Sequence, residues 1–358
     1  MPVARQLCFA RCLVAGCLAL VASQLHAEPA SYAAEADVFA REMVERHGFD
    51  SADLEGVLAN ARYSQAIVDA MNRPYEAKPW RDYRALFVTP ARIAGGVTFW
   101  SENADLLARV EADYGVAPQI IVAIIGVETN YGANVGKHRV IDALTTLGFS
   151  YPRRATFFRR ELEAFLVLSR EEQLDPLGAV GSYAGAMGKP QFISSSYRNY
   201  AIDFDGDGRR DLWGSNADVV GSVANYFKQH GWRPGEPVAF AAELRSGVPA
   251  GITVVEKSPA LPDTTAGDLR AAGVAWDETL SADVPASLIR LDGVEDEYWV
   301  GLSNFYAITR YNHSNLYAMA VYQLSEEIRE NRSKATSSGT AADPSAADAH
   351  ESAENDSD

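Results

Sequence analysis

The sequence predicts an α+β protein that is mostly helical, with one small β-rich segment inserted late in a helical body. Two observations support this fold class. Apolar residues recur at three- and four-residue spacing through residues 32–115 and again at 155–170, 216–230 and 314–330, which is typical of amphipathic helices. Between residues 236 and 294 the apolar segments are short, rich in β-branched residues and bounded by turn residues, which is typical of strands.

The first helices are predicted from apolar spacing and from start signals. "AEADVFAREMVERHGF" and "ADLEGVLANA" show the helical spacing of apolar residues. In "TPARIAGGVTFWSENADLLARVEADYG" the N-cap and the first helical residue are Thr89 and Pro90. Pro118 likewise opens an apolar helix that ends at Glu128. The expected strands are "PVAFAAEL", "GITVVEK" and "ASLIRLDG". The segment that follows, "EYWVGLSNFYAITRYN", is again rich in aromatic residues and precedes a final helix.

The first 27 residues are typical of an export signal. Two arginines precede an apolar run that is too short for a transmembrane helix, and a cleavage site follows Ala27. "VAGC" also matches a lipoprotein cleavage box with Cys17 as the lipidated residue, so a soluble exported form and a lipid-anchored or uncleaved form are both open. All three cysteines lie in this leader, so its cleavage leaves no disulfide, thiol nucleophile or cysteine-bound zinc in the mature chain.

Composition narrows the class of protein further. The chain has 358 residues, of which 47% are hydrophobic and 22% charged, and this suits a globular protein of one large domain or two to three small ones. A net charge of −16 and the lack of a basic stripe argue against nucleic acid as a partner. The six histidines are scattered without metal-binding spacing. The tail from Ala335 holds six acids, no Lys or Arg and no large apolar residue, which predicts disorder.

A single charged residue closes the apolar stretch in "QIIVAIIGVETNYGANVG". Glu128 follows an apolar run that begins at Ile120, and an ionised carboxylate is costly beside so much apolar surface. Loss of hydration and the negative end of the helix dipole both raise the pKa of a carboxyl group, so Glu128 should stay protonated near neutrality. A general acid for glycosidic cleavage needs this property. The alternative is a surface glutamate at the end of a buried helix.

Two further features are candidates for ligand contact. In "GSYAGAMGKPQF", small residues alternate with Ser182, Met187 and Gln191, which lets the backbone approach a ligand closely, although a tight structural loop has the same composition. Aromatic residues recur near the motifs, and sugar rings stack on aromatic faces, although aromatic residues equally form ordinary core. These are Tyr83, Tyr131, Tyr226, Trp232, Tyr306, Tyr311 and Tyr317.

The segment "DFDGDGRRDLW" is similar to a calcium-binding loop. Positions 1, 3, 5 and 6 of an EF-hand loop are matched by Asp203, Asp205, Asp207 and Gly208. Arg209 would supply its backbone carbonyl and Asp211 falls at position 9, but Gly214 stands at position 12, where a glutamate is usual. Asp218 is the nearest acid downstream that would close the site. We therefore expect a structural Ca²⁺ site, with a solvated Asp-rich turn and a regulatory calcium sensor as the alternatives.

Together these motifs resemble one family, the lytic murein transglycosylases of the B type (glycoside hydrolase family 103). The matching pieces follow the family order from about Tyr83 to Leu324 and are "GVETNYG", "LGFSYPRRATFF", "GSYAGAMGKPQF", "SSYRNYAIDFDGDGRRDLW", "GSVANYFKQHGW" and "ITRYNHSNLYAMAV". The resemblance implies a lysozyme-like catalytic core. With the composition, it suggests a signal peptide (1–27), an N-terminal helical domain (28–115), the core with its calcium loop (116–235), a small β-rich domain (236–294), the C-terminal part of the core (295–330) and a disordered acidic tail (331–358).

The resemblance also implies an activity, which is non-hydrolytic cleavage of the β-1,4 bond between N-acetylmuramic acid and N-acetylglucosamine in peptidoglycan. Glu128 would be the single acid/base: it protonates the glycosidic oxygen as an oxocarbenium-like state forms, then takes the proton of the C6 hydroxyl that attacks C1. The product ends in a 1,6-anhydro ring. Gly126 and Gly132 are expected to leave room for the sugar chain.

Other positions are assigned by the same resemblance. The substrate-binding residues are Tyr83, Ser182, Gln191, Phe192, Tyr226, Tyr311, Asn312 and Tyr317. The calcium ligands are Asp203, Asp205, Asp207, Arg209 through its carbonyl, Asp211 and Asp218. Lys189 and Pro190 depart from the family pattern, which often shows an aromatic residue and glycine there.

The implied setting is the periplasm, with peptidoglycan glycan strands as substrate, other cell-wall enzymes as candidate partners, and a monomeric chain. The membrane is a partner only if Cys17 is lipidated, and no organic cofactor is expected. A hydrolytic muramidase and an inactive wall-binding scaffold are the alternatives.

Overall fold

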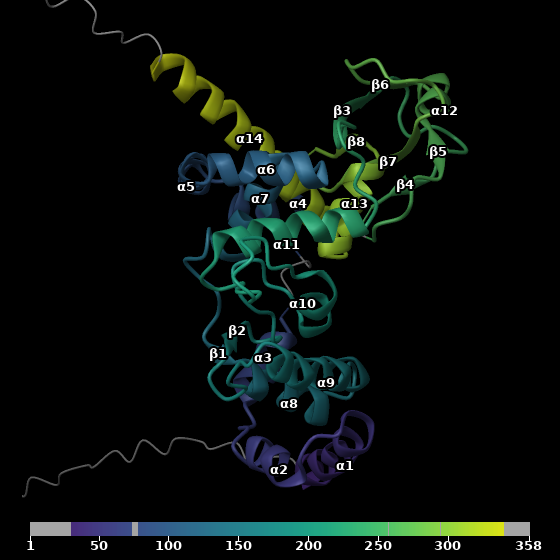
Figure 1. Cartoon of the computed structure of the whole chain (residues 1–358). Coiled ribbons are helices and arrows are strands. Elements are labelled where there is room, and N and C mark those ends of the chain that lie inside the picture. The colour runs from purple at the N-terminus through teal and green to yellow at the C-terminus, as the bar shows by residue number, and fades with distance from the viewer. Residues whose placement is uncertain (1–29, 74–77, 257, 294, 340–358) are drawn as a thin grey trace, which may run out of the picture.

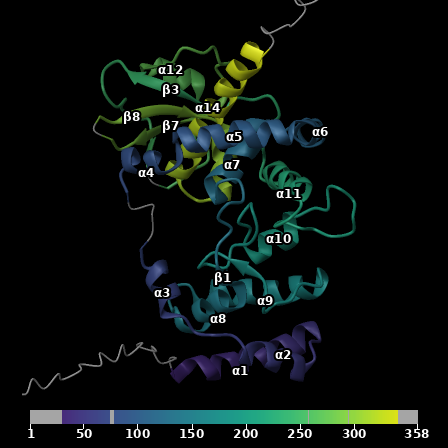
Figure 2. The ribbon, with the colours of Figure 1, turned by 90° about the vertical axis from the view of Figure 1, so that its left-hand side faces the viewer.

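The computed structural model describes residues 30–73, 78–256, 258–293 and 295–339. The leader and its three cysteines therefore lie outside the described residues. The described chain forms two helical lobes, one above the other, with a β-rich segment beside the upper lobe (Figure 1). The same arrangement is seen from the side in Figure 2.

The lower lobe is built from helices of the N-terminal region and from the middle of the chain. It comprises α1 (Ala30–His47), α2 (Ser51–Ala59), α3 (Gln65–Met71), β1 (His138–Arg139), α8 (Val140–Ser150), α9 (Ala155–Glu171) and β2 (Val180–Gly181). The helices α8 and α9 pack along each other, and α1 and α3 pack on α8. The Asp50 side chain caps α2 by accepting the backbone N–H groups of Ala52 and Asp53.

The upper lobe surrounds the apolar helix α7. Its members are α4 (Trp80–Phe87), α5 (Pro90–Glu102), α6 (Ala104–Tyr114), α7 (Pro118–Thr129), α11 (Asn216–Gln229), α13 (Ser303–Tyr311) and α14 (Asn315–Gly339). Because α5, α6, α11 and α14 all pack on α7, every residue from Ile120 to Val127 is buried. This enclosure explains why α7 lacks the alternating polar face of a surface helix.

The expected helix starts are confirmed, with one break that spacing did not reveal. The Thr89 hydroxyl accepts the N–H of Arg92, and Pro90 is the first residue of α5. The apolar pattern of 89–115 divides into α5 and α6 at Asn103, whose side-chain amide donates to the Phe99 carbonyl. The helices predicted within 28–115 therefore serve both lobes, since α1–α3 pack below and α4–α6 pack above.

The β-rich segment forms a six-stranded sheet with its own small core. It comprises β3 (Ala239–Leu244), β4 (Val254–Val255), β5 (Thr264–Thr265), α12 (Ala266–Ala271), β6 (Val274–Ala275), β7 (Pro285–Leu291) and β8 (Glu297–Gly301). The order is β4-β7-β8-β3-β6, with β5 also paired to β7; all pairs are antiparallel except β4 with β7. Leu288 pairs with Val300, and both are buried beside Leu269. The sheet thus extends past residue 294, because β8 pairs with both β3 and β7.

A helix occupies the start of the range predicted to be a disordered tail. The final helix α14 continues to Gly339, so residues 331–339 are helical, and residues 340–358 lie outside the described residues. Ion pairs of Glu326 with Arg329 and Glu330 with Lys334 lie along its exposed surface, and such pairs stabilise a helix that no longer packs on the core. Among the described residues no single helix is long and apolar enough to cross a membrane, although α6 and α7, bent by 114°, pass that test as a pair.

Candidate active site

The catalytic candidate Glu128 lies in the last turn of α7, immediately before a tight reversal of the chain. Asn130 and Tyr131 both adopt left-handed backbone conformations, with φ of 50° and 61°. The Thr129 hydroxyl donates to the Lys189 carbonyl at 2.8 Å and accepts the Gly132 N–H at 3.0 Å. The polar residues after Glu128 therefore end the helix and attach it to the neighbouring loop.

The Tyr131 ring fills a notch that glycines create. A β-carbon on Gly126 would lie 2.6 Å from the Tyr131 hydroxyl, and one on Gly95 would lie 2.8 Å from its ring. The Tyr131 hydroxyl donates to the Arg92 carbonyl at 2.7 Å, which fixes the ring between α5 and α7. The expectation that Gly126 leaves room for a sugar chain is therefore wrong, because a protein side chain takes that space.

Glycine at position 132 is explained by its backbone conformation. Its φ is +91°, a region that side-chain-bearing residues rarely adopt, and a β-carbon there would lie 3.1 Å from the Lys189 side chain. The backbone at Gly132 thus packs against Lys189, and the expected space for a sugar is again occupied by protein.

Glu128 is partly exposed as a whole residue, but its carboxyl group is enclosed by protein. Burial raises its pKa to about 7, while a hydrogen bond from the Tyr317 hydroxyl to Oε1, 2.6 Å long, acts in the opposite direction. The direction of this shift and its main cause are those expected from the apolar sequence. Near neutral pH, Glu128 can therefore either hold or release a proton.

Two tyrosines continue from Glu128 toward a cavity. The rings of Tyr317 and Tyr311 are stacked, with centroids 6.4 Å apart and planes inclined by 8°. Burial, with the nearby Glu128 charge as the next cause, holds the pKa of both phenols well above the usual value. Both therefore stay protonated and can donate hydrogen bonds, as Tyr311 does to the Pro190 carbonyl at 2.7 Å. Tyr83 is buried on α4 and lies near Tyr317.

The adjoining cavity has a volume of about 650 Å³ and lies between the two lobes. Residues of α9 line it from below, and those of α11 and α13 from above. Five of the predicted substrate-binding residues line it, namely Gln191, Phe192, Tyr226, Tyr311 and Asn312. The fold thus gathers residues that are up to 121 positions apart in sequence, from Gln191 to Asn312.

Sequence reasoning missed three basic residues of this cavity. Arg154, Arg310 and His313 line it, although the chain as a whole is strongly acidic. Arg154 lies over the Phe157 ring, with 4.4 Å from its guanidinium carbon to the ring centroid. The motifs "YPRRATFF" and "ITRYNH" contained these residues, but only the tertiary arrangement places them in one cavity.

The loop that contains Ser182 and Gln191 is held by its own polar groups. The Ser182 hydroxyl accepts the N–H groups of Ala184 and Ala186, so it shapes the loop and does not line the cavity. Gln191, with φ of 53°, donates from Nε2 to the Gly188 carbonyl at 2.9 Å. This segment is therefore a tight structural loop at Ser182 and also a part of the cavity lining at Gln191, so both interpretations of its composition apply.

The predicted metal loop brings three carboxylates together. Oxygen atoms of Asp203, Asp205 and Asp218 all lie within 4.8 Å of one another. Asp218 is fully buried, and its two oxygens accept the N–H groups of Phe204 and Asp211 at 2.8 and 2.7 Å. Burial raises its pKa, and the charges of Asp205 and Asp203 add to the shift.

This carboxylate group has the chemistry of a hard-cation site. Among the residues that the structure describes, no Lys, Arg or His forms an ion pair with Asp203, Asp205 or Asp218. Three adjacent negative charges without such a partner fit Ca²⁺, which prefers several oxygen ligands.

Two other predicted ligands point elsewhere in this structure. Asp207 accepts the N–H of Arg209 at 2.8 Å, and one oxygen of Asp211 accepts those of Trp213 and Gly214, each at 2.9 Å. Neither carboxylate belongs to the group of three. Asp207 and Asp211 therefore act first as turn-forming residues of the loop.

Comparison with known proteins identifies the family of this chain. The family described as "Transglycosylase SLT domain" matches residues 31–326. The chain is 46% identical over 305 residues to "Membrane-bound lytic murein transglycosylase B" of Escherichia coli (strain K12), covering 82% of each chain.

Solved structures agree with this similarity. The soluble lytic transglycosylase SltB1 from Pseudomonas aeruginosa is 50% identical, with a TM-score of 0.78 over 84% of this chain and 99% of that chain. The Escherichia coli lytic transglycosylase Slt35 in complex with calcium is 46% identical, with a TM-score of 0.75 over 84% and 94%. SltB3 from Pseudomonas aeruginosa, in complex with NAG-NAM-pentapeptide, is 32% identical, with a TM-score of 0.75 over 84% and 80%.

Proposed function

The chain belongs to the transglycosylase SLT domain family, and on that basis we propose how it acts on peptidoglycan. It is a lytic transglycosylase that cleaves the β-1,4 bond between N-acetylmuramic acid and N-acetylglucosamine and leaves a 1,6-anhydro end. Glu128 serves as its single acid/base. The observation that carries this assignment is a carboxyl group with a pKa of about 7, hydrogen-bonded to Tyr317, whose ring stacks on Tyr311 in the lining of a cavity of glycan-binding size.

Glu128 acts first as an acid. Below its pKa of about 7 the carboxyl group carries a proton, which it donates to the glycosidic oxygen as the bond to C1 breaks. The Tyr317 hydroxyl, 2.6 Å from Oε1, stabilises the carboxylate that this step leaves behind. Tyr311, stacked beside Tyr317, keeps that phenol in position.

Glu128 then acts as a base. Its carboxylate accepts the proton of the C6 hydroxyl, whose oxygen attacks C1 and closes the 1,6-anhydro ring. Each cycle thus returns the proton to Glu128, and no water enters the products. A pKa close to neutrality suits a group that must donate and accept within one turnover.

Family membership favours this reaction over hydrolysis. Hydrolytic glycosidases use a second carboxylate, either as nucleophile or to activate water. The relatives are lytic transglycosylases, and on that basis we assign the substrate's own C6 hydroxyl as the nucleophile.

The remaining predicted residues receive roles in binding. We assign glycan contact to the five predicted residues that line the cavity, namely Gln191, Phe192, Tyr226, Tyr311 and Asn312. We assign to the buried Tyr83 the role of positioning Tyr317. Ser182 maintains the loop shape through its two accepted hydrogen bonds. For Ca²⁺, the ligands with the strongest support are Asp203, Asp205 and Asp218, and the metal would hold this loop against α11 without taking part in the chemistry.

The similarities also support a place in the cell envelope. A relative is described as membrane-bound, and a related structure contains NAG-NAM-pentapeptide. We propose that this protein works on glycan strands in the periplasm, as a monomer, with its β-rich segment as a separate small domain supported by a core of its own.

The test is digestion of purified peptidoglycan by the wild type and by Glu128→Gln, followed by mass spectrometry of the released ends. We expect anhydro ends from the wild type and no release by the variant. Reducing muramic acid ends would instead identify a hydrolase, and an active Glu128→Gln variant would remove Glu128 from the mechanism.

A further inference from the structure

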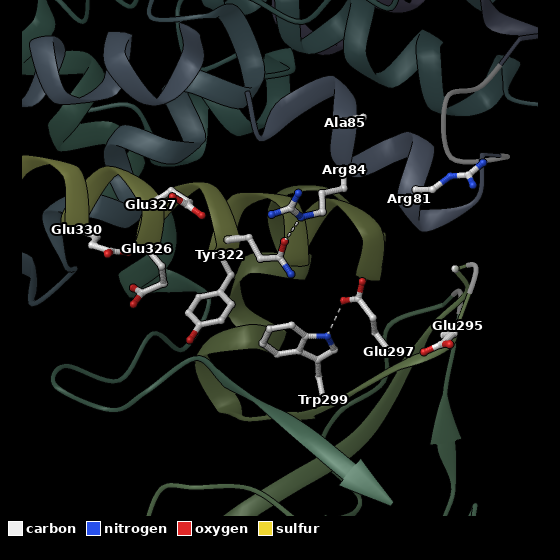
Figure 3. Close-up of a pocket in the computed structure, with 12 residues that line it drawn as sticks. Arg81, Arg84, Ala85, Glu295, Glu297, Trp299, Tyr322, Glu326, Glu327 and Glu330 are labelled. Carbon is white, nitrogen blue, oxygen red and sulfur yellow. Dashed lines mark hydrogen bonds between the residues drawn. The ribbon is translucent and has the colours of Figure 1, made fainter. Parts of the chain in front are cut away.

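A second cavity lies outside the catalytic site, between α4, α14 and β8. Its volume is about 770 Å³. Figure 3 shows Arg84 on α4 and Tyr322 on α14 facing Trp299 on β8. None of its lining residues takes part in the chemistry proposed for Glu128.

The second cavity and the Glu128–Tyr317 hydrogen bond lie on different faces of α14. Tyr317 and Tyr322 are five positions apart on α14, so their side chains point about 140° apart around the helix axis. On α4, the adjacent residues Tyr83 and Arg84 likewise point about 100° apart. Tyr317 donates a hydrogen bond to Glu128, and Tyr83 lies near Tyr317, so the layer of α4 and α14 separates the second cavity from Glu128.

One side of the second cavity is an aromatic corner. The rings of Trp299 and Tyr322 meet edge to face, with centroids 6.2 Å apart and planes inclined by 89°. Tyr322 is anchored through its hydroxyl to the Ala239 carbonyl at 2.8 Å, and both rings remain partly exposed. The rigid, accessible indole face offers a flat apolar surface on which the C–H face of a sugar ring can stack.

The other side presents planar polar groups that hold one another in place. Arg84 donates from Nε to the Gln323 side-chain oxygen at 2.5 Å, which leaves the remaining N–H groups of the guanidinium for a ligand. Trp299 donates from Nε1 to Glu297 at 3.3 Å. Both hydrogen bonds are drawn in Figure 3, above and beside the indole. Such fixed donors and acceptors suit the hydroxyl and amide groups of an N-acetylated sugar.

Five glutamates and two arginines line this cavity, so its lining is acidic. Glu326 and Glu330 pair with Arg329 and Lys334 along α14, and Arg81 pairs with Asp82 on α4. Among the described residues no ion pair compensates the other three glutamates, although Glu297 accepts the indole N–H of Trp299. Carboxylate oxygens accept hydrogen bonds from sugar hydroxyl groups as well as from cations, and the salt dependence tested below distinguishes the two.

We propose that this cavity is a second, non-catalytic saccharide site, which binds an N-acetylated glycan on the side of α4 and α14 opposite to Glu128. Neutral sugars match the aromatic corner and the planar polar groups together. The proposal takes from the proposed function only that glycan strands are the polymer within reach. A strand held there would keep the enzyme on the wall between cleavage events.

Binding is tested with insoluble peptidoglycan sacculi as the probe and Glu128→Gln as the background, so that turnover does not interfere. We expect Trp299→Ala to weaken co-sedimentation about tenfold, and Trp299→Phe, which keeps an aromatic face, to restore most of it. Arg84→Ala should weaken it several-fold without altering the sheet. The matched control is Leu261→Ala, which removes a side chain that is 65% exposed elsewhere in the same β-rich segment.

Activity gives a second measurement that separates this proposal from the assignment of Glu128. With Glu128 intact, Trp299→Ala should raise KM on sacculi and leave kcat unchanged, while turnover of a soluble tetrasaccharide of the wall repeat stays at the wild-type level. Unchanged co-sedimentation of both Trp299→Ala and Arg84→Ala would overturn the proposal. So would a loss of binding that follows Glu327→Gln and added salt but not Trp299→Ala, because that pattern identifies a site for basic peptides. Neither result depends on whether Glu128→Gln is inactive.

Discussion

The hydroxyl of Tyr317 donates to Oε1 of Glu128 over 2.6 Å, although 189 positions separate the two residues in the chain. This bond favours the ionised carboxylate, whereas burial favours the protonated acid, and burial is the larger effect. The balance leaves the pKa of Glu128 at about 7. Several expected outcomes follow from this relationship and from the packing around it.

Tyr317→Phe should move the pH dependence of activity upward. Without the donated hydrogen bond the pKa of Glu128 rises further, because only the burial effect is left. A hydrogen bond to a charged group contributes about 1.5 kcal/mol, so the alkaline limb of kcat/KM should move up by about one pH unit. The measurement is the kcat/KM profile from pH 5 to 9 on soluble peptidoglycan fragments. A variant with lower activity but an unmoved limb would show that Tyr317 does not tune Glu128.

Glu128→Gln should make the protein more stable at alkaline pH while abolishing activity. The pKa of Glu128 is raised by folding from 4.5 to about 7, so the folded state binds the proton more tightly and stability falls as the pH rises between these values. Above pH 7 the cost of the buried charge amounts to about 3 kcal/mol. Thermal melts of both proteins at pH 5 and pH 8 measure it. The advantage of the variant should be larger by several degrees at pH 8; an advantage independent of pH would contradict the raised pKa.

Gly126→Ala should destabilise the protein and reduce activity together. The added methyl group would lie 2.6 Å from the Tyr131 hydroxyl, so the Tyr131 ring must leave its notch and the reversal after Glu128 must shift. Overpacking of this kind costs about 1–3 kcal/mol. Urea denaturation and a peptidoglycan digestion assay measure the two effects.

Gly56→Ala is the matched control for that substitution. Gly56 lies within α2, and a β-carbon there would meet nothing within 4 Å. Because alanine favours a helix more than glycine does, we expect a gain of about 0.5–1 kcal/mol and unaltered activity. Equal effects of the two substitutions would mean that the Tyr131 notch has no special role.

Calcium should raise the melting temperature through Asp218. Calcium that binds only the folded state adds about 2.7 kcal/mol at a hundred times its Kd, so EDTA should lower the melting temperature of the wild type by several degrees. Asp218→Asn should abolish the response, since it removes charge from the buried member of the carboxylate group. Asp207→Asn should retain most of it, because the Asp207 carboxylate bonds to the Arg209 N–H instead. A melt that EDTA leaves unchanged would argue against calcium.

The sequence predicted the helices better than the strands, for a physical reason. The spacing of apolar residues located α1, α2, α9 and α11 closely, because helical hydrogen bonds are local and the pattern reports one buried face. Strand β8 was not predicted, since "EYWVG" becomes a strand only through its partners β3 and β7. The helical part of α14 beyond residue 330 was missed because polar composition alone does not distinguish a solvated helix from a disordered tail.

In the candidate site, too, features that depend on neighbours in the chain were predictable, and contacts between distant segments were not. By itself the sequence determined that Glu128 closes an apolar helix, that its pKa should rise, and that aspartates alternate in a loop suited to calcium, because each of these depends on neighbours in the chain. Only the tertiary structure decided which phenol reaches Glu128, which three aspartates gather, that Tyr131 occupies the space beside Gly126, and that α4 and α14 carry a second cavity on their other face. These are contacts between distant segments, whose geometry is set by the packing of whole helices, and no local pattern encodes it.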